Sequence, residues 1–230
     1  MHETNDKKYG SPPKKRKLIT HKKIISAAIS VADKAGVEGL SMRSIAKKLG
    51  IEAMSLYNHV KNKDEILDQI VDKIFSEIKW DQSNKSWRES MTERAISTRE
   101  VLKKHPWAVT ILESRKNPGP TTLAHHDAVI GCLRKAGFSL PLTAAAFSAL
   151  DSYIFGFVMS EQSLPFESDE EVAILAEQML SQFPKDAFPN LYEFTADYVF
   201  KPGYSYKKEF LNGLDLLLDS LESRFSSERK

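Results

Sequence analysis

The chain has 230 residues, of which 41% are hydrophobic and 28% charged, with a net charge of +2 at pH 7. These proportions are typical of a soluble globular protein and exclude a fibrous or low-complexity chain. The single cysteine, Cys132, excludes an internal disulfide framework and a multi-cysteine zinc site, so a reducing compartment is expected. No apolar run reaches about 18 residues and the chain starts polar and basic, which predicts a cytoplasmic protein without a membrane segment.

The charge is unevenly distributed along the chain. Residues 1–63 carry 14 Lys and Arg against 5 Asp and Glu, a net charge of +9, whereas residues 64–230 carry a net charge of −7. A basic front favours a polyanionic partner for that part of the chain. Residues 1–17 show no apolar periodicity and are expected to form a disordered basic arm, which adds non-specific attraction to phosphates.

Four helices are expected in the first third of the chain, because apolar residues there recur at helical spacing. Gly36 and Gly50 are placed to end the first two helices, and Ser41 and Asn62 to cap the second and the fourth. The expected helices cover residues 20–35, 41–49, 53–60 and 62–78.

Beyond Trp80 nearly all of the sequence remains helical in pattern. The expected helices cover residues 87–104, 107–113, 121–136 and 139–163, a segment opened by Ser168 and Glu171, and residues 206–225. No segment of the sequence shows the two-residue alternation of a strand, and none is repeated. The prediction is an all-α protein, with an N-terminal three-helix domain over residues 18–79 and a larger helical domain over residues 80–230.

The stretch LGIEAMSLYNHVKNKDEI, residues 49–66, carries the functional signal. A helix, a turn at Gly50 and a second helix have the spacing of a helix-turn-helix, whose second helix lies in the DNA major groove. Leu56 and Val60 are expected to point inward and hold that helix. The side chains left to reach base edges and phosphates are Ala53, Met54, Ser55, Tyr57, Asn58 and His59. Lys63 begins the next helix, where its charge suits a phosphate.

The longer stretch GVEGLSMRSIAKKLGIEAMSLYNHVKNKDEILDQI resembles the DNA-binding domain of the tetracycline-repressor (TetR) family of bacterial regulators. The match covers about residues 20–79, and the run Leu-Tyr-x-His-Val-Lys-Asn-Lys is its most specific part. The resemblance implies contacts with DNA bases or phosphates by Arg43, Ala53, Met54, Ser55, Tyr57, His59 and Lys63.

Two positions depart from the residues that are common in this family. Met54 stands where relatives often carry a smaller or cyclic residue, and its apolar side chain favours a thymine methyl group. Asn58 stands where relatives often carry Trp, and its amide can address adenine or a phosphate. The operator sequence therefore does not follow from the resemblance.

The stretch FSLPLTAAAFSALDSYIFGFVMSEQ, residues 138–162, resembles the long helix of the family's regulatory domain, within a looser match over about residues 86–165. In the family, this helix and the last long helix pair with their copies in a second subunit. Small alanines permit close helix approach, and the Leu/Phe stripe of residues 206–225 favours a partner surface. A homodimer is therefore expected, and it fits a palindromic operator with half-sites about 34–36 Å apart. The alternative is that both stripes are ordinary intramolecular core.

The resemblance also implies release from DNA by a small-molecule effector, for which an apolar or aromatic compound is expected. The candidate pocket residues are Trp107, Ile111, His125, Cys132, Phe147, Asp151, Tyr153 and Phe157. The magnesium-dependent tetracycline site needs a His near WAVTIL, and this stretch holds none, so tetracycline is not expected. No cofactor or metal is expected.

Three other functions are weighed against this interpretation. The first is a DNA-binding regulator without a small-molecule switch, controlled by a protein partner or by its abundance. The second is a helical interaction module whose basic front contacts an acidic protein or a membrane. The third is an enzyme, which the absence of HExxH, P-loop, GxSxG and dinucleotide motifs from the sequence argues against. His125 and His126 are adjacent, about 100° apart on a helix, and so do not face one ion.

Overall fold

The structure is a computed structural model that describes residues 19–229 apart from 82, 113, 116, 164–179, 181, 183, 184 and 202. Within these residues it contains helices and no strand, which confirms the predicted all-α class. The α-helices are α1 (His21–Ala35), α2 (Met42–Leu49), α3 (Lys63–Phe75), α4 (Trp87–Lys104), α5 (Val109–Leu112), α6 (Pro120–Ala136), α7 (Leu140–Gln162), α9 (Pro189–Phe194) and α10 (Tyr206–Glu228). Shorter elements are the 3₁₀ helices η1 (Ala53–Asn58) and η2 (Pro106–Ala108) and the π-helix η3 (Thr195–Val199).

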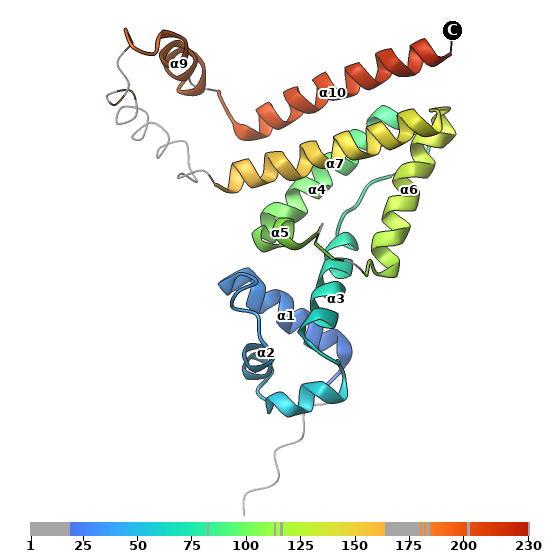
Figure 1. The fold of residues 1–230 in the computed structure, drawn as a ribbon, viewed down its shortest axis with the longest axis vertical. Helices are drawn as coiled ribbons and strands as arrows, with labels where there is room; N and C mark the ends of the chain where they lie inside the picture. Colours follow the sequence, from blue (N-terminus) through green and yellow to red (C-terminus); the bar gives the residue numbers. More distant parts are fainter. Residues whose placement is uncertain are drawn as a thin grey trace, which may run out of the picture.

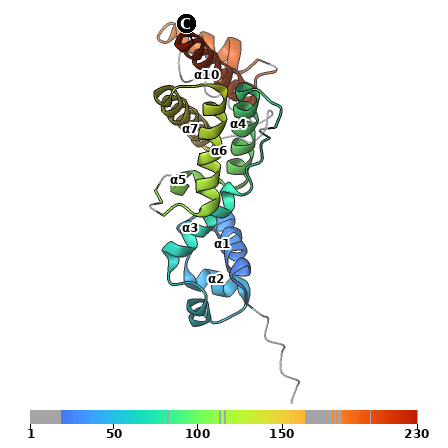
Figure 2. The ribbon, with the colours of Figure 1, turned by 90° about the vertical axis from the view of Figure 1, so that its right-hand side faces the viewer.

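Figure 1 shows a lower and an upper helical unit. The lower unit consists of α1, α2 and η1, and the upper unit contains α4, α6, α7 and α10. α3 runs between the units and packs against both α1 and α6. In Figure 2, α4, α6 and α7 stand side by side below α10. A small helix-turn-helix unit is thus followed by a larger helical unit, as predicted.

The predicted helix ends at Ser41, Gly50 and Asn62 are confirmed, whereas α3 ends at Phe75 and not at the predicted residue 78. Ser41 and Ser44 cap the start of α2 reciprocally, each accepting from the other's backbone N–H. Gly50 ends α2 in the left-handed conformation, at φ 70° and ψ 41°, which costs glycine little because it has no Cβ. Asn62 Oδ1 accepts from the Glu65 amide at 2.9 Å and so opens α3. These caps fix both ends of α2 and the start of α3.

The third helix differs from its prediction over residues 53–60. η1 is a 3₁₀ helix that ends at Asn58, with bonds such as the Ser55 amide to the Glu52 carbonyl at 3.0 Å. Glu52 supplies no side-chain cap. Leu56 and Val60 are both held in the core, so a very short segment must span fixed anchors. Short helical pieces of this kind commonly tighten into the three-residue repeat.

The apolar stripe of α10 packs within the chain. Five of its residues are buried in a core shared with α4, α6 and α7: Phe210, Leu214, Leu218, Leu221 and Phe225. The expectation that this stripe needs a partner surface is wrong for these residues, and the alternative of an intramolecular core holds for them. Leu211 and Leu217 are half-buried at its edge, whereas Leu216, outside the stripe, is 74% exposed.

Among the described residues, α7 is the one helix long and apolar enough to cross a membrane by length and composition. The sequence of α7 contains no uninterrupted apolar run of that length, because Asp151 lies within it. α7 packs against α4, α6 and α10, and Asp151 pairs with Arg94 of α4. These are the contacts of a core helix.

α9 and η3 are absent from the sequence-based prediction, which shows a break over residues 183–190 and no further helix before residue 206. Pro189 opens α9 at its first position, where a proline is tolerated because that N–H has no helical partner. The expected basic arm of residues 1–17 and the helix start at Ser168 and Glu171 lie outside the described residues.

Candidate DNA-binding surface and regulatory core

The recognition segment η1 lies at the end of the molecule farthest from α10 (Figure 1). Leu56 and Val60 are buried and fix one side of the segment to the core of the lower unit. On the other side Met54 is 74% exposed and Tyr57 is 48% exposed. Singly exposed apolar side chains are normal on a protein surface, so this exposure shows that both side chains are available for contact and does not by itself identify a partner. The segment therefore presents an apolar and aromatic surface on a rigid base.

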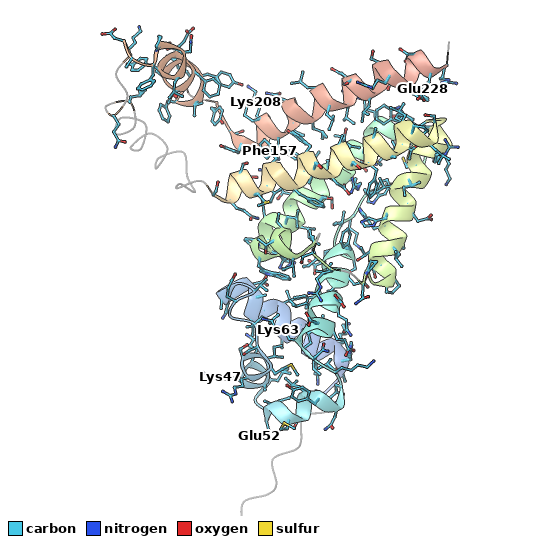
Figure 3. All side chains as sticks on the ribbon, viewed as in Figure 1. Lys47, Glu52, Lys63, Phe157, Lys208 and Glu228 are labelled. Atoms are coloured by element: carbon cyan, nitrogen blue, oxygen red, sulfur yellow. The ribbon has the colours of Figure 1, made fainter. Side chains whose placement is uncertain are left out.

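The predicted DNA contacts all lie in α2, η1, the residue after η1 and the first residue of α3. The exposed ones are Arg43, Met54, Tyr57, Asn58 and His59, and the half-buried ones are Ala53, Ser55 and Lys63. Figure 3 shows Lys47 and Glu52 near the lower end of the molecule and Lys63 further up. Lys47 is an exposed cation and Glu52 an exposed anion, so the charge at this end is mixed.

Lys63 is less available than the sequence suggests. Its Nζ donates to the Val37 carbonyl at 3.4 Å, which turns the side chain toward the loop between α1 and α2. The Glu65 amide in the first turn of α3 is already bonded to Asn62, and Glu65 itself accepts from the Lys61 amide at 2.7 Å. A phosphate at this helix start would have to share these donors.

The core of the upper unit contains a buried ionic centre on three helices. Arg94 of α4 is 1% exposed and forms an ion pair with Asp151 of α7. Arg94 Nε donates to His125 Nε2 of α6 at 3.1 Å. A buried charge needs both a counter-charge and hydrogen bonds, and this arrangement supplies them from α6 and α7. We call Arg94, His125 and Asp151 the ionic centre.

Aromatic rings surround the ionic centre. Phe75, at the end of α3, lies 5.2 Å from the His125 ring centroid and 5.4 Å from that of His126. Phe147 of α7 lies 5.4 Å from the His126 ring. Trp80, in the connection between α3 and α4, lies 6.2 Å from the His125 ring. Polar groups and ring edges are thus gathered where α3 meets the upper unit.

His125 is held neutral by this environment. Burial, followed by the neighbouring Arg94 guanidinium and His126, lowers the pKa of His125 from 6.5 to about 3. The neutral ring leaves Nε2 with a lone pair, which accepts the bond from Arg94. Burial is also the largest cause of the lowered pKa of His126.

The His125 pKa predicts a loss of stability in mild acid. The pKa of His125 in the folded protein is below its unfolded value of 6.5. As the pH falls, His125 is therefore protonated in the unfolded chain while it stays neutral in the folded one, which favours unfolding. This one group should lower the free energy of unfolding by about 2 kcal/mol between pH 8 and pH 5. Urea unfolding of the wild type and of His125→Gln at both pH values measures the difference. Parallel pH curves for the two proteins would contradict the assignment.

The structure places the predicted effector residues in four separate regions. His125, Phe147 and Asp151 lie at or beside the ionic centre. Tyr153 and Phe157 instead meet Phe210 of α10, and Figure 3 shows Phe157 between α7 and α10.

The remaining predicted effector residues lie elsewhere. Trp107 donates to Asp33 Oδ1 of α1 at 2.6 Å, and Ile111 belongs to the same core cluster as the lower unit. Cys132 is half-buried beside the upper core. Among the described residues, no group of His, Cys, Asp or Glu side chains gathers in a way that could hold a metal ion.

The sequence-based prediction missed Arg94, the residue around which the ionic centre forms. A signal for it exists in the helical spacing. Trp87, Met91, Arg94 and Thr98 recur at intervals of four, three and four residues, and all are buried. An arginine in an inward-facing series predicts a buried counter-charge on another helix.

Two family models match the chain. "Bacterial regulatory proteins, tetR family" matches residues 24–70, and "Tetracyclin repressor-like, C-terminal domain" matches residues 81–225. The transcriptional repressor DrrR1 of Streptomyces coeruleorubidus is 30% identical over 221 residues, which cover 92% of this chain and 80% of DrrR1. An HTH-type transcriptional regulator of Saccharopolyspora erythraea is 39% identical over 145 residues. That match covers 63% of this chain and 61%, less than two thirds, of the relative.

Solved structures have the same fold. Apo ActR from Streptomyces coelicolor superimposes with a TM-score of 0.76 at 24% identity, covering 91% of this chain and 98% of ActR. ActR in complex with (S)-DNPA gives a TM-score of 0.73 at 25% identity, covering 89% of this chain and 98% of that chain. One model spans the recognition segment and the other spans the ionic centre, and the chain belongs to the tetracycline-repressor (TetR) family of bacterial transcriptional regulators.

Proposed function

We propose that this regulator binds a palindromic DNA operator as a homodimer, represses transcription there, and is released by a small-molecule effector. In this proposal residues 18–79 bind DNA and residues 80–230 bind the effector and the second subunit. The observation that carries it is the exposed face of η1, which follows a left-handed turn at Gly50 and is anchored by Leu56 and Val60. A short helix with one side fixed and the other exposed is suited to the major groove.

The proposed base and phosphate contacts follow from the side chains on this face. The exposed thioether of Met54 suits a thymine methyl group, and the Asn58 amide suits adenine or a phosphate. Arg43 and His59 are exposed on either side of them in sequence and can donate to bases or phosphates. Ala53, Ser55 and Lys63 complete the proposed set at the edges.

Selection of bound DNA from a random pool tests this function. A two-fold symmetric motif is expected, because two copies of η1 must read two equivalent half-sites. Recovery of an asymmetric motif, or of DNA with no common sequence, would count against a symmetric operator-binding dimer. Binding is to be measured at one fixed salt concentration, because phosphate contacts make affinity salt-dependent.

Tyr57→Ala should weaken binding to the selected operator by about 1–3 kcal/mol, the range for one base or phosphate contact. Half of the Tyr57 side chain is exposed, so the substitution should leave the melting temperature nearly unchanged. Tyr198→Ala is the matched control, because Tyr198 is 46% exposed but lies in η3, far from η1 in the chain. Equal operator affinity for the wild type and Tyr57→Ala would remove Tyr57 from the proposed surface.

The proposed effector site is the ionic centre with its surrounding rings. ActR has been solved in complex with actinorhodin and with (S)-DNPA, so a protein of this fold holds such small molecules. In this chain the Arg94–Asp151 pair offers hydrogen-bonding groups, and Phe75, Phe147 and Trp80 offer ring surface, which suits an aromatic effector with polar substituents.

Titration with actinorhodin as a probe tests the effector site. Saturable binding that lowers operator affinity supports the proposal, because an effector must favour the state that binds DNA less well. If a screen of actinorhodin and other aromatic compounds shows no effect on operator affinity, control by a protein partner or by abundance replaces the small-molecule switch.

A further inference from the structure

Three aspartates of α3, Asp64, Asp68 and Asp72, recur every four residues and therefore lie along one face of the helix. Asp64 and Asp68 bond to the connection between α5 and α6, and Asp72 bonds to the first turn of α6. Arg115 donates from Nε to Asp68 at 2.6 Å and from a terminal nitrogen to Asp64 at 3.3 Å. Asp72 Oδ1 accepts from the Thr122 amide at 2.8 Å and from the Thr122 hydroxyl at 3.1 Å. This face of α3 thus holds the upper unit by charge and by hydrogen bonds.

The Asp72 contact is a helix cap that comes from a different helix. The N-cap residue of α6 is Gly119, which has no side chain to satisfy the first amides. Asp72 takes that role, and its negative charge also suits the N-terminal end of a helix. A Cβ on Gly119 would lie 2.4 Å from Asp72 Cγ, so only glycine permits this close approach.

The same turn of α6 leads to the ionic centre. His125 lies one turn after Thr122 and accepts from Arg94. Phe75 lies three residues after Asp72 on α3 and contacts the rings of His125 and His126. At its other end, α3 begins a few residues after η1. One rigid helix therefore connects the proposed effector site to the recognition segment, and Asp72 is its polar bond to α6.

We propose that Asp72 is a positioning residue that couples the effector site to the DNA-binding surface. While the first turn of α6 keeps its position, the hydrogen bonds between Asp72 and Thr122 hold α3 in one position relative to α6. When that turn shifts, these hydrogen bonds are lost and α3 can move to a second position. The inference rests on the proposed function, since DNA and effector must each favour one arrangement. Coupling between two binding sites is reciprocal, so DNA binding must also alter the first turn of α6.

Hydrogen exchange of the full-length protein tests this coupling without a known effector. The probe is duplex DNA that the wild-type protein selects from a random pool. In the wild type, DNA binding should change exchange protection of the first-turn amides of α6, Thr122 among them, by about 5- to 150-fold. Asp72→Ala should lose this change. Asp72→Asn should keep most of it, because an amide oxygen also caps a helix.

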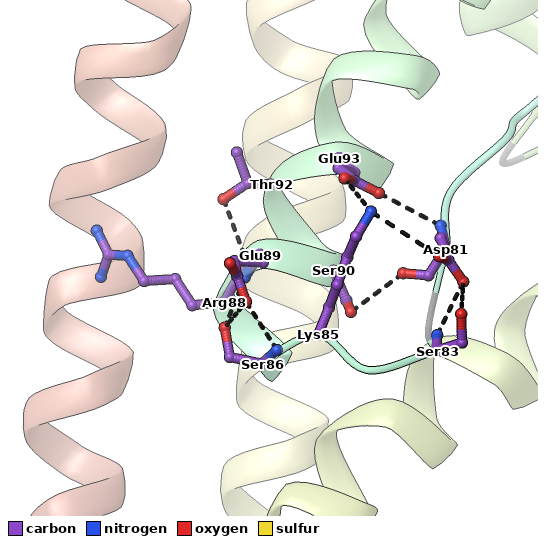
Figure 4. A network of polar contacts seen from close by, with 9 residues as sticks. All are labelled: Asp81, Ser83, Lys85, Ser86, Arg88, Glu89, Ser90, Thr92 and Glu93. Carbon is purple, nitrogen blue, oxygen red and sulfur yellow. Dashed lines mark hydrogen bonds and ion pairs between the residues drawn. The ribbon is translucent and has the colours of Figure 1, made fainter.

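Glu89→Ala is the matched control (Figure 4). Glu89 accepts from the Ser86 amide at 2.9 Å and the Ser86 hydroxyl at 2.7 Å, so it also caps a helix start. This cap joins Glu89 only to Ser86, the residue before α4, and does not connect two helices. Glu89→Ala should therefore destabilise the protein but preserve the DNA-induced change in exchange protection of α6.

Three results would overturn the inference. The first is an unaltered DNA-induced change in Asp72→Ala, and the second is its loss in Glu89→Ala, because stability alone would then explain the effect. The third is a wild type that binds its selected DNA with no change in α6, which removes the coupling and leaves DNA binding intact. A wild type that selects no DNA would instead overturn the proposed function, and the coupling with it.

Discussion

Asp151→Ala is expected to lower the free energy of unfolding by about 3–5 kcal/mol, the range for breaking a buried ion pair by removing one partner. Arg94 would keep its charge inside the core, where its side chain is 2% exposed. His125 cannot compensate, because burial holds its pKa near 3 and its neutral ring supplies only one acceptor. Urea unfolding at neutral pH measures the loss.

An exposed pair provides the control for this prediction. Arg88 of α4 forms ion pairs with Asp215 and Asp219 of α10, whose side chains are 63% and 70% exposed. Asp215→Ala removes the same kind of carboxylate from an arginine on the same helix, but water screens the charge that remains. The loss should therefore stay below about 1 kcal/mol. Equal losses for Asp151→Ala and Asp215→Ala would show that the ionic centre is not buried in solution.

The double variant Arg94→Met/Asp151→Leu separates the charge from the packing. Removing both charges leaves no unpaired ion, and such replacements of buried pairs are often neutral or stabilising. The double variant should therefore be more stable than Asp151→Ala. If it also fails to respond to an effector, the pair is retained for binding rather than for stability.

Local chemistry made the helix boundaries predictable. Gly50 ends α2 because glycine readily takes the left-handed conformation, and Asn62 begins α3 because its side chain accepts from the Glu65 amide. Both effects are local and do not depend on the rest of the fold. The exposed face of η1 was predictable for the same reason. Leu56 and Val60 had to point inward, and that choice left Met54 and Tyr57 outside.

Long-range contacts were not predictable in the same way. Periodicity shows that the stripe of α10 is buried, but it does not show whether another helix of the chain or a second subunit buries it. The helical spacing of α4 indicates that Arg94 faces inward, but its partners His125 and Asp151 lie 31 and 57 positions away, so no local pattern identifies them. An isolated arginine in a helix full of charged residues, as in α4, is easily taken for a solvated one.

The packing of α7 also shows which of its residues face the core and which face solvent, a distinction that is hard to make from its largely apolar sequence. The inward face carries Leu142, Leu150, Ile154 and the charged Asp151. The exposed side carries small or flexible residues without charge: Ala144, Ala145, Ser148, Ser152, Gly156 and Met159. Small residues let two helices approach closely. This exposed side of α7 is a better candidate for the subunit interface than the stripe of α10, which is buried within the chain.

Ser152→Arg is expected to separate the proposed dimer and to weaken operator binding by about 10²- to 10⁴-fold, because the advantage of joining two half-sites is lost. The new side chain is long and charged, and it would stand in the middle of a close helix contact. Arginine has a higher helix propensity than serine, so α7 itself should not unfold. Sedimentation at micromolar concentration measures the association, and operator binding at fixed salt measures the affinity.

Ala124→Arg is the matched control for Ser152→Arg. Ala124 is exposed on α6, outside the proposed interface, and its substitution adds the same positive charge to the same unit. The added charge alone attracts DNA, so Ala124→Arg should bind the operator at least as tightly as the wild type and remain dimeric. Affinity for a single half-site should be similar in both variants, because η1 is unchanged. A Ser152→Arg protein that still sediments as a dimer would place the subunit interface elsewhere on the molecule.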